Sequence, residues 1–123
     1  DQLDPSISNY VVAGLITSGK HFLESGKKDQ AINAFHKAES LSGSKDMFMK
    51  EIILSLIKAG DKEQAESFLE RSSDAVKKSA DIHAQQLEAI HLSYPPTRVL
   101  KIALNMINSG IKHPKIFEIK SLI

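Results

Sequence analysis

Cysteine is absent from the chain, and so are long apolar runs. Without cysteine, the fold cannot rely on disulfides or on a thiolate-bound metal ion. Apolar runs such as 52–57 are far shorter than the ~20 residues of a membrane-spanning helix, and the first residues lack the pattern of a cleavable secretion signal. These absences favour a cytoplasmic location and predict that a membrane is not among the partners.

A strong charge of either sign is also missing, because 16 Lys and Arg residues balance 15 Asp and Glu residues to leave +1. A net charge this small creates no field that would attract nucleic acid or anionic lipid. Five scattered cations follow Pro95, against Glu118 alone: Arg98, Lys101, Lys112, Lys115 and Lys120. Such spacing is typical of solvated helix faces rather than of a phosphate-binding patch, so we expect no nucleic-acid partner.

The residues that the chain does contain fit one ordinary domain. Its 123 residues are 41% hydrophobic and 25% charged, a composition that can build a core of its own. Because the sequence opens at Asp1 rather than at a methionine, we expect this single domain, 1–123, to be a fragment of a longer chain.

The stretch from Gly19 to Ala38, GKHFLESGKKDQAINAFHKA, introduces a pattern that returns downstream. Gly26 interrupts two runs of helical periodicity, which predicts a helix, a tight turn and a second helix. Thirty-four residues later the same order recurs in three pairs of positions: Gly26 and Gly60, Ala31 and Ala65, and Phe35 and Leu69. A 34-residue period built from helix pairs indicates a solenoid.

At these residues the chain resembles the tetratricopeptide repeat family. The family's order of small, aromatic and glycine residues is matched, apart from Ser18, by Leu15, Gly19, Phe22, Gly26, Ala31, Phe35 and Ala38. Gly19 and Ala31 leave room where two helices cross, and Phe22 and Phe35 fill the space beside them. The resemblance implies an all-α superhelix, or solenoid, of about three helix pairs plus a C-terminal capping helix.

The 34-residue register divides the chain into units at about 12–45, 46–79 and 80–113, followed by a terminal helix at 114–123. Caps and turns predict helices at about 5–25, 28–41, 45–59, 62 to the polar run at 71–74, 75–93 and 96–108. Asp29 is expected to cap the second helix, Gly43 to end it in the left-handed conformation, and Ser44 to cap the third. In the third unit Val99 and Ala103 exchange the large and small positions of the first, as in a diverged repeat.

No arrangement of residues in the sequence predicts catalysis, a metal or a cofactor. Glu88 and His91 form one Glu-x-x-His on a predicted helix, whereas di-metal bundles need two such motifs and two further carboxylates. The histidines are therefore interpreted as surface residues: His21, His36, His83, His91 and His113. Glycine-rich phosphate loops and nucleophile elbows are missing, and capping explains the serines that cluster at turns. We expect the protein not to be an enzyme.

In the family that the chain resembles, the first helices of successive repeats line a concave groove that receives a partner segment. Carried onto this chain, the resemblance implies a partner groove of Ile16, Lys20, Leu23, Lys50, Glu51, Leu54, Ile57, Gln85, Glu88 and His91. An apolar centre at Leu54 and Ile57 suits an amphipathic helix or an extended peptide. Glu51 and Asp81 stand where chaperone-binding members clamp a terminal carboxylate, which argues against that specificity. For each apolar residue, packing between the repeats or under the chain's own terminal helix is an equally good interpretation.

Two functions remain open at this point. The first is a protein-interaction scaffold whose groove binds a peptide or helix of a partner protein. The alternative is a regulatory or structural module that contacts another domain of the same chain, for instance in a bacterial signalling protein of the response-regulator kind. The sequence preceding Asp1 would distinguish the two.

Overall fold

Residues 5–123 are described by the computed structural model, and they form eight helices joined by turns, with no strand among them. The helices are α1 (Pro5–Glu24), α2 (Lys28–Ser42), α3 (Asp46–Lys58), α4 (Lys62–Glu70), α5 (Asp74–Lys77), α6 (Ala80–Ile90), α7 (Pro96–Asn108) and α8 (Pro114–Ser121). The predicted all-α class is confirmed for these residues. Each predicted helix start lies within one residue of an observed start.

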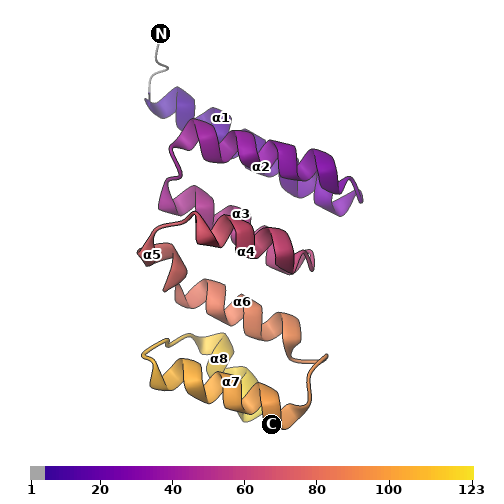
Figure 1. The fold of residues 1–123 in the computed structure, drawn as a ribbon, viewed down its shortest axis with the longest axis vertical. Coiled ribbons are helices and arrows are strands. Elements are labelled where there is room, and N and C mark those ends of the chain that lie inside the picture. Colours follow the sequence, from indigo (N-terminus) through magenta and orange to yellow (C-terminus); the bar gives the residue numbers. More distant parts are fainter. Residues whose placement is uncertain (1–4) are drawn as a thin grey trace.

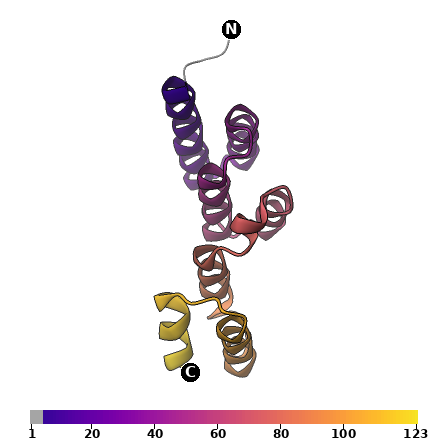
Figure 2. The ribbon, with the colours of Figure 1, turned by 90° about the vertical axis from the view of Figure 1, so that its left-hand side faces the viewer.

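The helices are arranged in tiers along the long axis of the molecule (Figure 1). Helix α1 packs against α2 in the first tier, α3 against α4 in the second, and α7 against α8 at the far end. Figure 2 shows α1, α3 and α6 following one another in one column, with α2, α4 and α7 beside them. Because α1 contacts α3, α3 contacts α6 and α6 contacts α8, these four helices form a continuous row, which we call the central row.

The 34-residue spacing reflects the same turn built twice. Gly26 and Gly60 adopt φ values of 75° and 83°, in the left-handed region that side chains other than hydrogen disfavour. The Gly26 amide donates to the carbonyl of Leu23 at 3.2 Å, and the Gly60 amide donates to that of Ile57 at 3.0 Å. These bonds satisfy carbonyls that the helix ends would otherwise leave unpaired. Each turn therefore sends the chain back along the helix that it has just left.

Phe35 is the centre of the first tier. Its side chain is fully buried, and its ring meets that of Phe68 edge to face, with the ring centroids 6.4 Å apart. A Cβ atom at Gly19 would overlap the Phe35 ring, so α1 and α2 can cross closely only because position 19 has no side chain. The predicted burial of Phe35 is confirmed. Four more residues of the repeated pattern are buried, Gly19, Ala31, Ala38 and Ala65, and two pack half-buried on the same core, Phe22 and Leu69.

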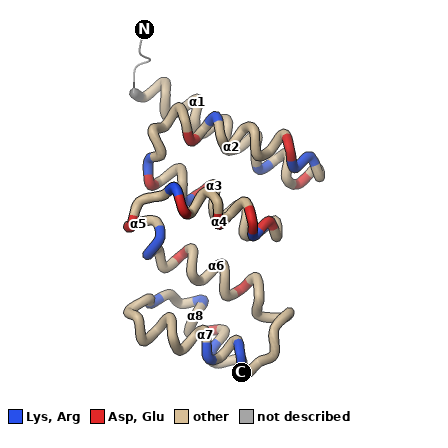
Figure 3. The backbone as a smooth tube through the Cα atoms, viewed as in Figure 1, with Lys and Arg blue, Asp and Glu red and all other residues tan. Residues whose placement is uncertain are grey.

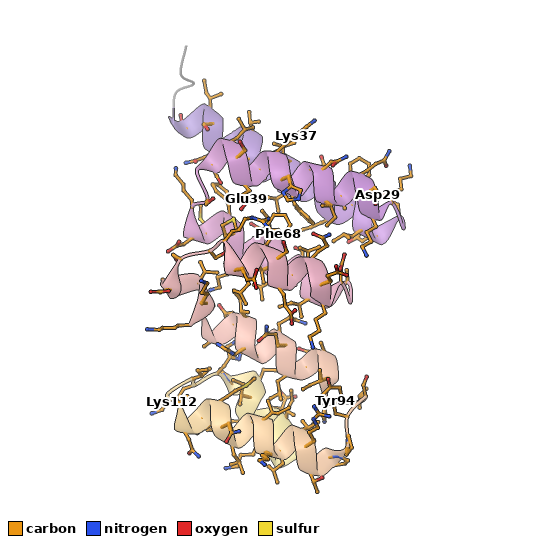
Figure 4. All side chains as sticks on the ribbon, viewed as in Figure 1. Asp29, Lys37, Glu39, Phe68, Tyr94 and Lys112 are labelled. Atoms are coloured by element: carbon orange, nitrogen blue, oxygen red, sulfur yellow. The ribbon has the colours of Figure 1, made fainter. Side chains whose placement is uncertain are left out.

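Polar contacts join helices α2 and α4, and Figure 4 shows Glu39 of α2 near Phe68 of α4. The Arg71 guanidinium donates from Nε to Glu39 at 2.8 Å and lies over the Phe68 ring, 4.5 Å from its centroid. At the other end of the same helices, Lys28 Nζ lies 3.2 Å from Asp61 Oδ2. These contacts pair the beginning and the end of α2 with the beginning and the end of α4, which fixes the register between the two tiers.

Apart from Ala34, the buried apolar residues of the described chain form two clusters that meet at α6. The first cluster contains side chains of α1 to α5 and ends at Ile82. The second begins at Ala84 and Leu87 and continues through α7 and α8, where it holds Val99, Ala103, Ile116 and Ile119. Helix α6 thus contributes to both clusters.

The predicted helix at 75–93 is wrong, because the chain divides it into α5 and α6 and ends α6 at Ile90. The Ser73 hydroxyl accepts from the Val76 amide and donates to Asp46 Oδ1 on α3 at 2.7 Å. This contact fixes a single helical turn against α3, and the buried Val76 side chain anchors it. The chain then turns at Lys78 and Ser79 before α6 begins.

Two predicted caps are also wrong. Helix α2 begins at Lys28, so Asp29 lies in its first turn. There its negative charge interacts favourably with the helix dipole, but its side chain does not cap the helix. Ser44 follows Gly43 in the left-handed region, with φ values of 60° and 65°. The chain needs both residues to turn, so Lys45 rather than Ser44 takes the N-cap position of α3. Gly43 ends α2 in the left-handed conformation, as predicted.

Candidate partner-binding groove

A ladder of ion pairs and hydrogen bonds crosses the central row from tier to tier. Lys20 Nζ of α1 lies 2.6 Å from Glu51 Oε1 of α3. The Nζ atom of Lys50, which precedes Glu51 on α3, lies 2.5 Å from Asp81 Oδ2 of α6. The other carboxylate oxygen of Asp81 lies 2.9 Å from Nε2 of His113, the N-cap residue of α8. Each contact thus joins one helix of the row to the next, and together they link all four.

Two shallow hollows lie beside this ladder and meet at Leu54 and Gln85. The first hollow is lined by Lys20, Leu23, Glu24, Glu51, Leu54, Ser55, Lys58, Ala59 and Gln85. The second is lined by Leu54, Asp81, Ala84, Gln85, Glu88, His113 and Lys115. We call the residues of both hollows the groove. Leu23 and Leu54 form its apolar floor, since both are half-buried and pack on the first core cluster.

Most residues of the sequence-predicted groove are brought together here. Six of them line the two hollows: Lys20, Leu23, Glu51, Leu54, Gln85 and Glu88. Lys50 lies at the edge of the groove, where it pairs with Asp81. His91 does not line either hollow, because it stands at the C-cap of α6, one residue past the end of the helix.

Ile16 and Ile57 do not belong to the groove, and this part of the prediction is wrong. Their side chains expose only 1% and 7% of their surface and belong to the first core cluster. Ile57 turns toward the opposite side of the row, where it lines a cleft with Ala65 and Leu87. Helix α3 is apolar on several faces, so helical spacing alone could not show that Leu54 faces outward and Ile57 inward.

Asp81 is the most strongly connected charge in the groove. It lies in the first turn of α6, where a carboxylate also interacts favourably with the helix dipole. The Lys50 ammonium, which donates to this carboxylate, lowers the pKa of Asp81 below its ordinary value of 3.8, and His113 adds to the shift. Asp81 therefore stays ionised through the whole neutral range.

His113 has a defined tautomer in this geometry. Its Nδ1 atom accepts a hydrogen bond from the Lys115 amide at 3.0 Å. A ring nitrogen that accepts carries no proton, so in the neutral ring Nε2 carries the proton and donates it to Asp81. His113 thus caps α8 with one nitrogen and binds α6 with the other.

Sequence reasoning treated His113 as an ordinary surface residue and considered Asp81 only as a groove position that argues against a carboxylate ligand, and it predicted the contacts of neither residue. A signal for both was nevertheless present. Partners of opposite charge stand 31 residues apart at Lys20 and Glu51 and again at Lys50 and Asp81, and 32 residues separate Asp81 from His113. In a stack of helix pairs, this spacing places each residue beside its partner in the next tier.

Both signs of charge are spread over the first tiers, whereas acidic residues become sparse beyond α6 (Figure 3). Within residues 5–123, no three His, Asp or Glu side chains are grouped so that they could hold a metal ion. Over the same residues, no helix has the length and apolar character that crossing a membrane requires.

Comparison of the chain with family models, with curated proteins and with solved structures finds no match in any of the three. The resemblance to tetratricopeptide repeats therefore stays a prediction that depends on the residues quoted above. The groove is likewise defined by its own geometry rather than by a relative.

Proposed function

We propose that the protein is a cytoplasmic interaction scaffold of the tetratricopeptide kind, a solenoid that binds a peptide or helix of a partner protein in the groove. Support for the solenoid comes from the 34-residue repetition of the glycine turn and from the row of contacts α1 to α3 to α6 to α8. Helix α8 takes the place of the capping helix, because it packs on both α6 and α7 at the end of the row.

The observation that carries the proposal is an apolar floor between charged edges. Leu23 and Leu54 remain half-exposed in the hollow, and burying apolar surface stabilises a complex by about 25 cal/mol per Å². Gln85, which lies between the two hollows, carries an amide that can both donate to and accept from a partner backbone. An apolar floor with a polar edge is the usual anatomy of a protein-binding site.

The edge of the groove can adapt to a partner at little cost. Lys20 and Glu51 expose 41% and 45% of their side chains while paired. Ion pairs as exposed as this contribute only about 0–1 kcal/mol. A charged residue of the partner can therefore replace either member without a large loss of stability. The pairs link neighbouring tiers in the free protein and offer both signs of charge to a ligand.

Selection of binding peptides tests the proposal. A phage-displayed library of random peptides would be panned on the wild-type protein, and the dissociation constants of enriched peptides measured by calorimetry. We expect Leu54→Ser to weaken binding by about fivefold or more, equal to ~1 kcal/mol or more, because it removes part of the apolar floor.

Leu41→Ser serves as the matched control, because Leu41 is a half-exposed leucine on α2 and does not line the groove. It should leave the dissociation constants unchanged. Amide shift changes on peptide addition should centre on Leu23, Leu54 and Gln85. Peptides that bind both variants as tightly as the wild type, or whose shift changes lie on α2 and α4, would contradict a binding site in the groove.

A further inference from the structure

Helix α1 carries an exposed apolar face at the end of the stack. Ile7, Tyr10 and Val11 leave 54%, 84% and 41% of their surface accessible and, with Ser6, line a shallow hollow. Their spacing of three and four residues places them on one side of the helix. The opposite side of α1 holds Val12, which is fully buried in the first core cluster.

The same face continues toward the C-terminus of α1 with small residues. Gly14, Thr17 and Ser18 are exposed, and they follow Ile7, Tyr10 and Val11 at helical spacing. A Cβ atom built at Gly14 would meet nothing within 4 Å, so the surface there is open. The face is therefore bulky in its first half and low in its second half.

Charge is missing from this part of the helix. The 15 residues from Pro5 to Gly19 include no Asp, Glu, Lys or Arg, whereas α3, the next helix of the row, has four such residues: Asp46, Lys50, Glu51 and Lys58. The uncharged start of α1 is visible in Figure 3. A surface that meets a copy of itself meets its own charges, so a charged face would repel its copy. The face of α1 imposes no such penalty.

We propose that this face binds a second copy of the chain, with the two α1 helices antiparallel and crossing near residues 12 and 13. A two-fold contact brings each residue of one copy opposite a different residue of the other. In the antiparallel arrangement, Ile7 and Val11 of one copy lie over Ser18 and Gly14 of the other. Tyr10 then lies between Gly14 and Thr17 of the other copy. Large side chains then fill the low half of the partner face on both sides of the axis. A parallel arrangement would place Tyr10 against Tyr10 and leave a gap between the two halves that carry small side chains.

The size of the face predicts a modest affinity. Tyr10 is the largest contributor, since an aromatic side chain buries on the order of 150–250 Å². One helix face on each side stays near the lower end of the about 1,200–2,000 Å² that stable interfaces bury in total. The dimer should therefore dissociate on dilution. This surface is separate from the groove, so pairing leaves the groove accessible.

Sedimentation velocity over a range of concentrations tests the pairing. The wild type should shift with rising concentration from the 13.6 kDa monomer toward twice that mass. Tyr10→Glu should remain monomeric, because it places two charges in the contact. Phe117→Glu is the matched control: it charges an aromatic residue that is 42% exposed on α8, at the other end of the stack, and should dimerise as the wild type does. A wild type that stays monomeric, or a Tyr10→Glu variant that dimerises equally, overturns the proposal.

The absence of native cysteine allows the orientation to be tested separately. Ile7→Cys and Ser18→Cys chains with different tags would be mixed and oxidised. The antiparallel pair places these positions opposite each other, so the mixed disulfide should dominate. In the antiparallel pair, the two Ile7 positions are separated by about 11 residues of helix, or ~16 Å. This distance is too long for a disulfide. Efficient cross-linking of Ile7→Cys to itself would show a parallel pair and overturn the arrangement, and equal yields of all products would show random collision.

Discussion

The Phe35 ring on α2 fills the space that a side chain at Gly19 on α1 would occupy. The same ring meets Phe68 on α4 edge to face. Through Phe35, the close approach of α1 and α2 is therefore coupled to the packing of the second tier on the first. A change at Gly19 should affect both.

We expect Gly19→Ala to destabilise the protein by about 1–2 kcal/mol, because the new methyl group must displace a fully buried ring in a packed core. The free energy of unfolding would be measured by urea titration at low protein concentration. Gly14→Ala is the matched control on the same helix. Its Cβ meets nothing within 4 Å, so it should stabilise by about 0.5–1 kcal/mol through helix propensity alone. Equal effects at the two positions would show that Phe35 does not fill this space.

Leu54 and Ile57 should respond differently to the same substitution. Ile57→Ser should cost about 2–5 kcal/mol of unfolding free energy, because it leaves a cavity and buries a hydroxyl in the core. Leu54→Ser should cost about 1 kcal/mol, since Leu54 is half-exposed in the groove. The two urea midpoints measure this difference. A larger loss at Leu54 than at Ile57 would mean that the inward and outward sides of α3 are exchanged.

The contact between Lys50 and Asp81 predicts a dependence of stability on pH. The pKa of Asp81 is lower in the folded chain than its ordinary value of 3.8, so its ionised form stabilises the fold. This contribution is fully present above pH 3.8 and is lost as the pH falls through the folded pKa. Asp81→Asn should therefore lower the free energy of unfolding by about 0.5–1 kcal/mol at pH 7, as expected for an exposed pair.

The difference between wild type and Asp81→Asn should stay constant from pH 7 to about pH 5 and shrink toward zero below the ordinary pKa of Asp. Urea unfolding at several pH values measures it. Lys50→Met should reduce stability at pH 7 by a similar amount. A difference that grows on acidification would have the wrong sign for a lowered pKa.

The tautomer of His113 can be read directly by NMR. At pH 8 the nitrogen shifts of its ring should show the proton on Nε2, because Nδ1 accepts from the Lys115 amide. His83, whose Nε2 lies 3.1 Å from the Lys77 carbonyl, is an internal reference that must also carry its proton on Nε2. A proton on Nδ1 of His113 would mean that the ring does not cap α8.

Apart from that of α6, the starts of the helices could be predicted because their signals are local. Gly26 and Gly60 each produce a turn that depends on a few neighbouring residues, and Pro96 and Pro114 stand at first helical positions where proline loses nothing. Helix α7 begins at Pro96, as predicted, and the preceding Tyr94 ring lies 4.5 Å from the Arg98 guanidinium carbon.

The remaining features could not be predicted because they depend on contacts between distant residues. The split of the predicted helix at 75–93 depends on the bond between Ser73 and Asp46, 27 residues apart. The burial of Ile16 and Ile57 depends on which side of α1 and α3 faces the neighbouring tier. The cross-tier ladder needs both the repeat register and the orientation of each helix about its axis. Of these two requirements, only the repeat register could be obtained from the sequence.

Helix α6 is the element through which the two core clusters are mechanically joined. It contributes Ile82 to the first cluster and Ala84 and Leu87 to the second. Because the tiers follow one another along the long axis of the molecule (Figure 1), tension applied to the two ends loads them in series. The second cluster holds fewer buried side chains, two of them alanines, and so has less apolar contact to resist a pull. Under tension α7 and α8 should detach first, while the first two tiers remain folded.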